Sequence, residues 1–483
     1  MSTTRTFRVA APMDPPVTSQ ARMVPSNGRA ATPAVAVDGS EKSSRYVYLA
    51  LLLFTFLLYA RPTDYIRALA GLPLLQFTGL GAIALYGLTL VFGRLRLVIS
   101  KETKIVAAIT ALFVIGIPVA YWRSNALDTV SDQWLKTMIT FWLITQIAFT
   151  ASRVRKIIWV ILISIFVVGA VTYLNPQPWY YREGRLQGAS FGFLSGNYLG
   201  PAVGSILPFM AVFLARSKSV WRSLFLFTVL GLSLLMVVQT ASRSNLLLVL
   251  FGLGLSWTYL LRKNNRTRIM GIVIAVSIVL SVAAAPGIFW ARVKTLWTGD
   301  VDNWATQSAA FSEEQRKGLF WRSVEYTVQH PLLGLGLGNF AIASGNNTGL
   351  AGEWKGTHNA YTQISSEAGI PALILYIALL LGTALRMRKL AKETERFYGR
   401  DPERGELHMM ALATKAGIYV YMLAGLFAHI AYEFHCYYLI GIAICLQRHW
   451  DEIRGTEPEL PPSAERSLRP WQRSSLKLSE HKT

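Results

Sequence analysis

Long apolar blocks separated by short polar and basic segments dominate the chain from residue 46 to residue 447. Within each block the apolar residues are nearly continuous, without the alternation of a half-buried soluble helix or strand. A helix needs on the order of 20 apolar residues to cross the hydrocarbon core of a bilayer. The pattern predicts an all-α, polytopic integral membrane protein with about twelve transmembrane helices. Their predicted bounds are 46–60, 72–92, 105–121, 135–150, 157–174, 191–214, 223–240, 245–261, 269–289, 369–385, 416–431 and 434–447.

The distribution of Lys and Arg predicts how these helices are oriented. Alternate loops, such as "GRLRLVISKETK" and "RKNNRTR", are dense in basic residues, and the loops between them are sparser. Basic loops stay on the cytoplasmic side of a membrane. Both termini are therefore predicted to be cytoplasmic, and the one long loop of the other face to be periplasmic or extracellular. The predicted order is a disordered tail (1–45), spans one to nine (46–289), the long loop with short helices (290–368), spans ten to twelve (369–448) and a second tail (449–483).

Composition agrees with a membrane protein and narrows its class. Of 483 residues, 52% are hydrophobic and 16% are charged, whereas a soluble chain carries roughly 25% charged residues. The net charge of +21 lies in the short basic loops, so nucleic acid is not an expected partner. Cys436 and Cys445 both fall in the last apolar block and imply no disulfide framework. The spans hold almost no charged residues at mid-depth, which disfavours an ion-coupled transporter.

The long loop contains a predicted helix. The segment "EEQRKGLFWRSVEYTVQHP" (313–331) spaces Phe320, Val324 and Val328 four residues apart, as one stripe of a helix. Pro331 is expected to end it.

The glycine-rich stretch "LLGLGLGNF" follows this helix. Gly334, Gly336 and Gly338 would let the backbone approach a phosphate or sugar closely. A kink at the membrane interface explains them equally well.

Three basic or titratable residues are predicted to lie on the outer face: Arg243, Arg316 and His358. Two arginines and a histidine on one face suit a lipid-linked diphosphate, because guanidinium groups match phosphate oxygens. Each residue also has a plainer interpretation. Arg243 could reach the interface as a snorkelling side chain, Arg316 could be a solvated charge, and His358 could help to cap a helix beside Asn359. Glu367 is expected to cap the start of span ten, or else to orient His358.

Three other features carry weaker hypotheses. Asp300 and Asp302 have the spacing of a metal-dependent sugar transferase, but a turn is the expected role. His429 and Glu433 are four residues apart and would share one helical face, as a proton relay, as a metal site or as a link between spans eleven and twelve. The structural link is favoured. The loop 386–415 mixes both signs of charge and predicts a solvated connector, although other envelope polysaccharide assembly proteins could dock on it.

The loop and its flanks together resemble the O-antigen ligase and polymerase superfamily. The segments "RKGLFWRSVEYTVQHPLLGLGLGNF" and "HNAYTQISSEAGIPALILY" are similar to its signature region, from an Arg opening a loop helix to His-Asn and Glu-x-Gly-Ile before a span. The "SR" of Arg243 and the "GNYLG" that contains Asn197 are similar to upstream elements of the family. The resemblance covers roughly residues 190–385. The family's tryptophan four residues after the loop arginine is replaced by Phe320, with Trp321 one position later.

The resemblance implies transfer of a glycan from undecaprenyl diphosphate to an acceptor hydroxyl, lipid A-core or similar, at the periplasmic face of the bacterial inner membrane. It implies that Arg243 and Arg316 bind the diphosphate and that His358 acts as base, with no cofactor and no metal. Substrate contacts are expected from Asn359, Glu367, Gly336, Gly338 and Asn197. A repeat-unit polymerase or a protein O-oligosaccharyltransferase of the same superfamily remains an alternative. A glycolipid flippase and a scaffold are alternatives from other classes.

Overall fold

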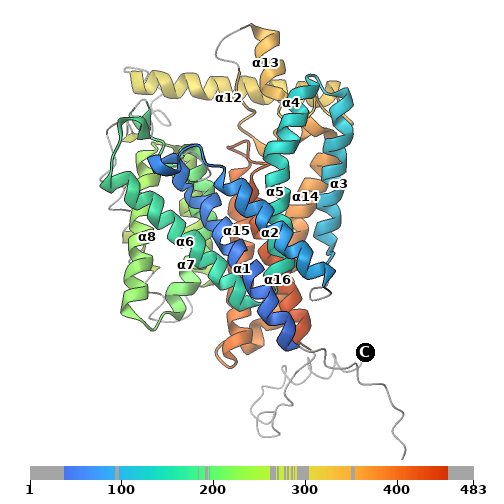
Figure 1. The fold of residues 1–483 in the computed structure, drawn as a ribbon. Helices are drawn as coiled ribbons and strands as arrows, with labels where there is room; N and C mark the ends of the chain where they lie inside the picture. Colours follow the sequence, from blue (N-terminus) through green and yellow to red (C-terminus); the bar gives the residue numbers. More distant parts are fainter. Residues whose placement is uncertain are drawn as a thin grey trace, which may run out of the picture.

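The computed structural model describes residues 37–92, 97–182, 184–190, 194, 196–260, 304–349 and 354–454, with scattered positions between 268 and 290. The described part is a helical bundle with one long helix, α12, lying across one end (Figure 1). We call this end the upper end, and the end where α1 begins and α16 stops the lower end. The helices are α1 (Val37–Ala60), α2 (Leu74–Val91), α3 (Lys101–Gly116), α4 (Arg123–Asp128), α5 (Leu135–Ile147), α6 (Ala151–Leu174), α7 (Leu199–Arg216), α8 (Val220–Gln239), α9 (Arg243–Tyr259), α12 (Trp304–Gln329), α13 (Phe340–Thr348), α14 (Ala360–Thr394), α15 (Pro402–Ala424) and α16 (Phe434–Ile453). A two-stranded antiparallel ribbon, β1 (Tyr181–Arg182) with β2 (Arg185–Leu186), is the sheet of the described residues.

The polytopic all-α prediction is confirmed. Among the described residues, eight helices are long and apolar enough to cross a bilayer: α1, α2, α3, α6, α7, α8, α14 and α15. Predicted spans four and eight correspond to the shorter helices α5 and α9, with 13 and 17 residues, and span twelve to α16. Most of predicted span nine lies outside the described residues, so the number twelve stays a prediction.

Helix α7 forms the centre of the bundle. Every residue from Leu199 to Leu214 is buried, and the helix packs against α9 and α15. Glycines allow this close approach: a Cβ on Gly252 would overlap the carbonyl oxygen of Gly204 on α7. Small residues at such crossings let two helix backbones come together and gain dispersion contacts.

The first and last helices extend beyond their predicted ends. Residues 37–45, predicted as part of the first tail, form the first turns of α1, and α16 continues to Ile453. A helix nucleated by its apolar part propagates into polar flanking residues at little cost, which explains both extensions. The remainder of the two predicted tails, 1–36 and 455–483, lies outside the described residues.

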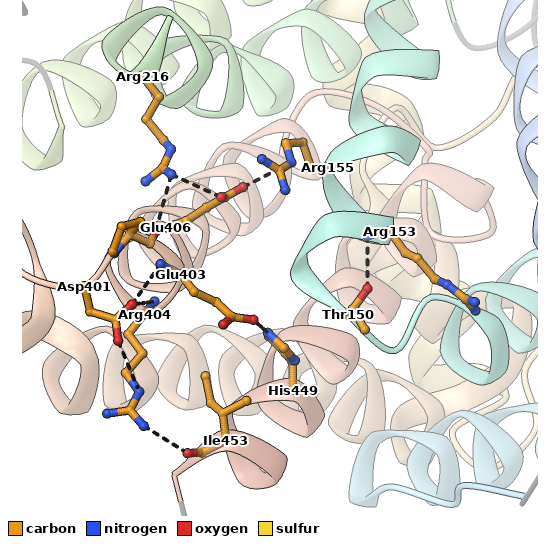
Figure 2. A network of polar contacts seen from close by, with 11 residues as sticks. Thr150, Arg153, Arg155, Arg216, Asp401, Glu403, Arg404, Glu406, His449 and Ile453 are labelled. Atoms are coloured by element: carbon orange, nitrogen blue, oxygen red, sulfur yellow. Dashed lines mark hydrogen bonds and ion pairs between the residues drawn. The ribbon is translucent and has the colours of Figure 1, made fainter. Parts of the chain in front are cut away.

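The prediction that segment 386–415 is a solvated connector is wrong. Helix α14 continues to Thr394, and α15 already begins at Pro402, so two helices occupy most of this segment. Its charged side chains are paired at the lower end of the bundle (Figure 2). Buried Glu406 forms ion pairs with Arg155 on α6 and Arg216 on α7, each at 3.3 Å. These charges can be buried because they pair with residues on helices distant in sequence. A local charge pattern cannot reveal such partners.

Helix α12 is the predicted loop helix, but it begins at Trp304 and presents a different face to the protein. Pro331 follows its last residue, Gln329, as expected. The predicted stripe points outward, since Phe320 is 36% exposed and Val328 is 73% exposed. The packed face is offset by one or two positions and consists of Leu319, Ser323 and Tyr326. A helix that lies across the end of a bundle also packs through small and polar residues such as Ser323. A search for apolar residues alone misses such positions.

Candidate functional site

The glycine-rich segment anchors α12 and α13 onto the start of α14. Gly334, Gly336 and Gly338 all have positive φ angles, of 63°, 87° and 74°. A Cβ at these positions would overlap the backbone of Glu367, the side chain of Ala120 and the hydroxyl of Thr129, respectively. Backbone hydrogen bonds from Leu335 to Ser366 (2.8 Å) and from Gly336 to Glu367 (2.9 Å) run along the same contact. These glycines therefore have a packing role, and their contact with a substrate stays a prediction.

Glu367 holds this segment from the other side. Its carboxylate accepts hydrogen bonds from the backbone amides of Gly338 (3.0 Å) and Phe340 (3.1 Å). It therefore satisfies free amides at the start of α13, where a negative charge also favours the helix dipole. The predicted capping of span ten by Glu367 is wrong, because Asn359 provides that cap: its Oδ1 accepts from the amides of Tyr361 (2.9 Å) and Thr362 (3.1 Å).

The backbone at His358 is held in an uncommon conformation. Its φ angle of 53° lies in the left-handed region, which costs free energy for a residue with a side chain and persists only where the surroundings fix it. The next residue, Asn359, caps α14, and the amide of Ala360 donates to the carbonyl of Gly425 at 2.7 Å. On the other side, Lys355 Nζ donates to Gln315 Oε1 of α12 at 2.6 Å. The imidazole is thus placed between α12 and the loop after α15.

A second histidine lies against His358. The His358 and His429 rings are 5.3 Å apart between centroids and meet edge to face. His429 Nε2 is 2.9 Å from the hydroxyl of Tyr198, which belongs to the short 3₁₀ turn η6 (Gly196–Tyr198). Helix α15 ends at Ala424, so His429 and Glu433 occupy an irregular loop, and the prediction that they share one helical face is wrong. The polar "AHIAYE" sequence within an apolar block was the available signal for this break.

Both imidazoles are predicted to be neutral at physiological pH. Burial, together with the neighbouring His429, Arg316 and Lys355, lowers the pKa of His358 to about 3. Burial also lowers the pKa of His429. Loss of hydration disfavours the charged form of a histidine, and nearby positive charge acts in the same direction.

Arg316 and His358 line one cavity of about 250 Å³. Its other lining residues are one basic residue, two polar residues and four apolar or aromatic ones: Lys317, Thr357, Asn359, Phe320, Trp321, Leu426 and Phe427. None of these described lining residues is acidic, so the cavity combines two fixed positive charges with a neutral imidazole. Such a site can neutralise an anion and still accept a proton. The structure thus brings together Arg316, His358 and Asn359 of the predicted site.

Arg243 begins α9, directly after the turn that ends α8. Ser242 caps the helix, and Asn245 Nδ2 donates to the carbonyl of Gly196 in η6 at 2.9 Å. The same 3₁₀ turn carries Asn197, whose Oδ1 accepts from Arg185 at 3.2 Å. Turn η6 therefore connects the segment of Arg243 to Tyr198 and through it to the histidine pair. Arg185, on β2, is a basic residue of this region that the sequence patterns did not single out.

The predicted metal sites have no support among the described residues. Asp300 and Asp302 lie outside the described residues. Among the described residues, no group of three or more His, Cys, Asp or Glu side chains is arranged to hold a metal ion.

Comparison with known families adds an independent observation. Residues 228–377 match the family described as O-Antigen ligase. We call this matched stretch the O-antigen ligase segment. It runs from within α8 to within α14 and so contains Arg243, Arg316 and His358. The family comprises membrane proteins of glycosyltransferase-like ligase and polymerase type, and no curated protein matches the chain.

The O-antigen ligase segment does not contain the whole site. Asn197, Tyr198 and His429 lie outside residues 228–377, and they contact it through the hydrogen bond to Asn245 and the ring contact with His358.

Proposed function

We propose that the protein transfers a glycan from undecaprenyl diphosphate to an acceptor hydroxyl, on lipid A-core or a similar molecule, at the periplasmic face of the inner membrane. The observation that carries this proposal is the shared cavity of Arg316 and His358 inside the O-antigen ligase segment. The cavity lies between α12 and the loop after α15, at the end of apolar helices, where a membrane-held donor and a water-soluble acceptor group can meet.

The charges of the cavity suit the donor. A diphosphate diester is anionic, and further charge develops on its leaving oxygen as the bond to the sugar breaks. Arg316 would bind the phosphate oxygens and neutralise that charge, with Lys317 beside it and Arg243 as the second predicted arginine. Asn359 and Asn197 remain predicted substrate contacts.

His358 would act as the base. Its neutral imidazole accepts the proton of the acceptor hydroxyl while the acceptor oxygen bonds to the anomeric carbon and undecaprenyl diphosphate departs. A base whose pKa is about 3 is weak in the empty site. A bound diphosphate offsets the positive charges of Arg316 and Lys317 and so raises the pKa of His358. Proton acceptance thereby becomes favourable when the donor is in place.

Two alternatives use the same chemistry with another acceptor: a repeat-unit polymerase and a protein O-oligosaccharyltransferase. A glycolipid flippase would need the same anion site without bond formation. In that case, substitution of His358 or Arg316 would keep the donor in the inner leaflet, whereas a transferase defect lets donor accumulate in the outer leaflet.

The glycan profile of a deletion strain distinguishes these functions. Long chains stranded on undecaprenyl diphosphate, with a bare acceptor, would indicate a ligase. Single repeats without long chains would indicate a polymerase, and an unchanged profile would contradict both. Complementation with His358→Ala should leave the defect in place. Complementation with Arg123→Ala, an exposed arginine at the start of α4, should repair it.

A further inference from the structure

A second and larger cavity, of about 760 Å³, lies beside the site. Its walls come from the end of α1 and the turn into α2, from the π-helical turn η4 (Thr129–Trp134) with the start of α5, and from Tyr198 and the segment 432–434. Tyr198 belongs to both regions, because its hydroxyl is 2.9 Å from His429 Nε2 and the His429 ring lies against His358. Tyr198 and His429 therefore stand between the larger cavity and the cavity of Arg316.

The two cavities differ in charge. In the larger one both signs of charge line the wall: Arg61 Nε lies 3.1 Å from Asp64 Oδ2, and Lys136 pairs with Asp132. Glu433 adds a third carboxyl group. The described lining of the smaller cavity contains Arg316 and Lys317 but no acid. An anion is thus favoured in the smaller cavity, whereas the larger one offers mixed donors and acceptors beside apolar surface. That combination suits a polyhydroxylated ligand.

Glu433 is the group of the larger cavity best placed to receive such a ligand. It directly precedes α16 and is partly buried. In the part of the chain that the structure describes, no hydrogen-bond or ion-pair partner contacts its carboxyl oxygens. Burial raises the pKa of Glu433 to about 7, with Arg61 opposing the rise. A carboxyl group held in this state can accept and donate hydrogen bonds to sugar hydroxyls.

We propose that the larger cavity binds the saccharide of the acceptor, with Glu433 hydrogen-bonded to its hydroxyl groups and Tyr198 marking the boundary with the donor site. The assignment of the ligand as an acceptor rests on the proposed function, because only a transferase needs a second saccharide next to the diphosphate.

The test is a binding measurement on the full-length protein in lipid nanodiscs. One probe is the oligosaccharide released by mild acid from the envelope glycolipids of a deletion strain, and the other is inorganic pyrophosphate. Glu433→Gln should weaken oligosaccharide binding about tenfold, the worth of one hydrogen bond to a charged group, and leave pyrophosphate binding unchanged. Thr63→Trp, which fills the cavity from the turn after α1, should abolish oligosaccharide binding. Arg316→Ala should show the reverse pattern.

Failure of wild-type protein to bind the oligosaccharide, or unchanged affinity in either cavity variant, would overturn the inference. Loss of pyrophosphate binding in Glu433→Gln would also overturn it, since the two cavities would not be separate sites. The proposed function is tested separately, because absence of transfer by the wild-type protein would refute it without altering oligosaccharide binding.

Discussion

The low pKa of His358 makes a specific prediction about the pH dependence of transfer. The perturbation is a change of pH from 7.5 to 5.5. In the ratio kcat/KM for the donor, the groups that titrate are those of the free enzyme. An ordinary histidine, with a pKa near 6.5, would be about 90% protonated at pH 5.5, and kcat/KM would fall about tenfold.

The structure predicts a different result. With a pKa of about 3, His358 is protonated in fewer than about one molecule in a hundred at pH 5.5. The sign follows from the depressed pKa: the neutral form persists as pH falls and is lost only as pH approaches the pKa itself. His358 should therefore contribute no acid limb between pH 7.5 and 5.5.

The assay uses purified protein in nanodiscs with lipid-linked donor and saturating acceptor. Glu433 titrates in the same range, near pH 7, so the profile is measured in wild type and in Glu433→Gln. Imidazole NMR of histidine-labelled protein provides a direct reading, and the His358 signal among the 7 histidines is assigned by its loss in His358→Gln. A midpoint near 6.5 in the Glu433→Gln profile, or in the NMR titration, would refute the reasoning.

Three further predictions concern binding and folding. Arg316→Ala should lower kcat/KM for the donor by about 10²-fold or more, and an effect as small as that of Arg123→Ala would contradict the assigned role. Gly369 has a φ of 83° and its α-carbon faces the carbonyl of Leu332, so Gly369→Ala should destabilise the fold by about 2–4 kcal/mol in thermal melts. Gly382→Ala, in open space on the same helix, should not, and equal melting of the two would count against backbone strain and overlap at Gly369. Glu406→Ala leaves Arg155 and Arg216 without their shared carboxylate and should cost about 1 kcal/mol; transfer per folded molecule should stay constant, and a fall would imply coupling to the upper end.

Apolar runs were enough to predict the helical membrane fold, because a bilayer imposes continuous hydrophobicity on each span. They failed at helix ends. Segment 402–415 looks polar, yet Arg404, Glu406 and His408 are buried in α15. Predicting this burial would require knowledge of the partners on α6 and α7, which lie more than a hundred residues away in sequence.

The site was predicted in part. Family resemblance and orientation both indicated Arg316 and His358, and the structure places them in one cavity. The neighbours that complete it, Tyr198 and His429, belong to segments far from the loop, and only the tertiary fold brings them together. Glu367 and the glycines stay predicted ligand contacts, because a carboxylate and flexible backbone are typical of binding sites. The structure adds that they fasten the loop to α14 through hydrogen bonds from backbone amides to the Glu367 carboxylate, which the local sequence pattern does not encode.

The most direct test of the central claim is a transfer assay with purified protein and radiolabelled lipid-linked glycan in nanodiscs. Wild type and Arg123→Ala should release undecaprenyl diphosphate and label the acceptor. His358→Ala should bind the donor and release none, whereas full transfer by His358→Ala would contradict the account.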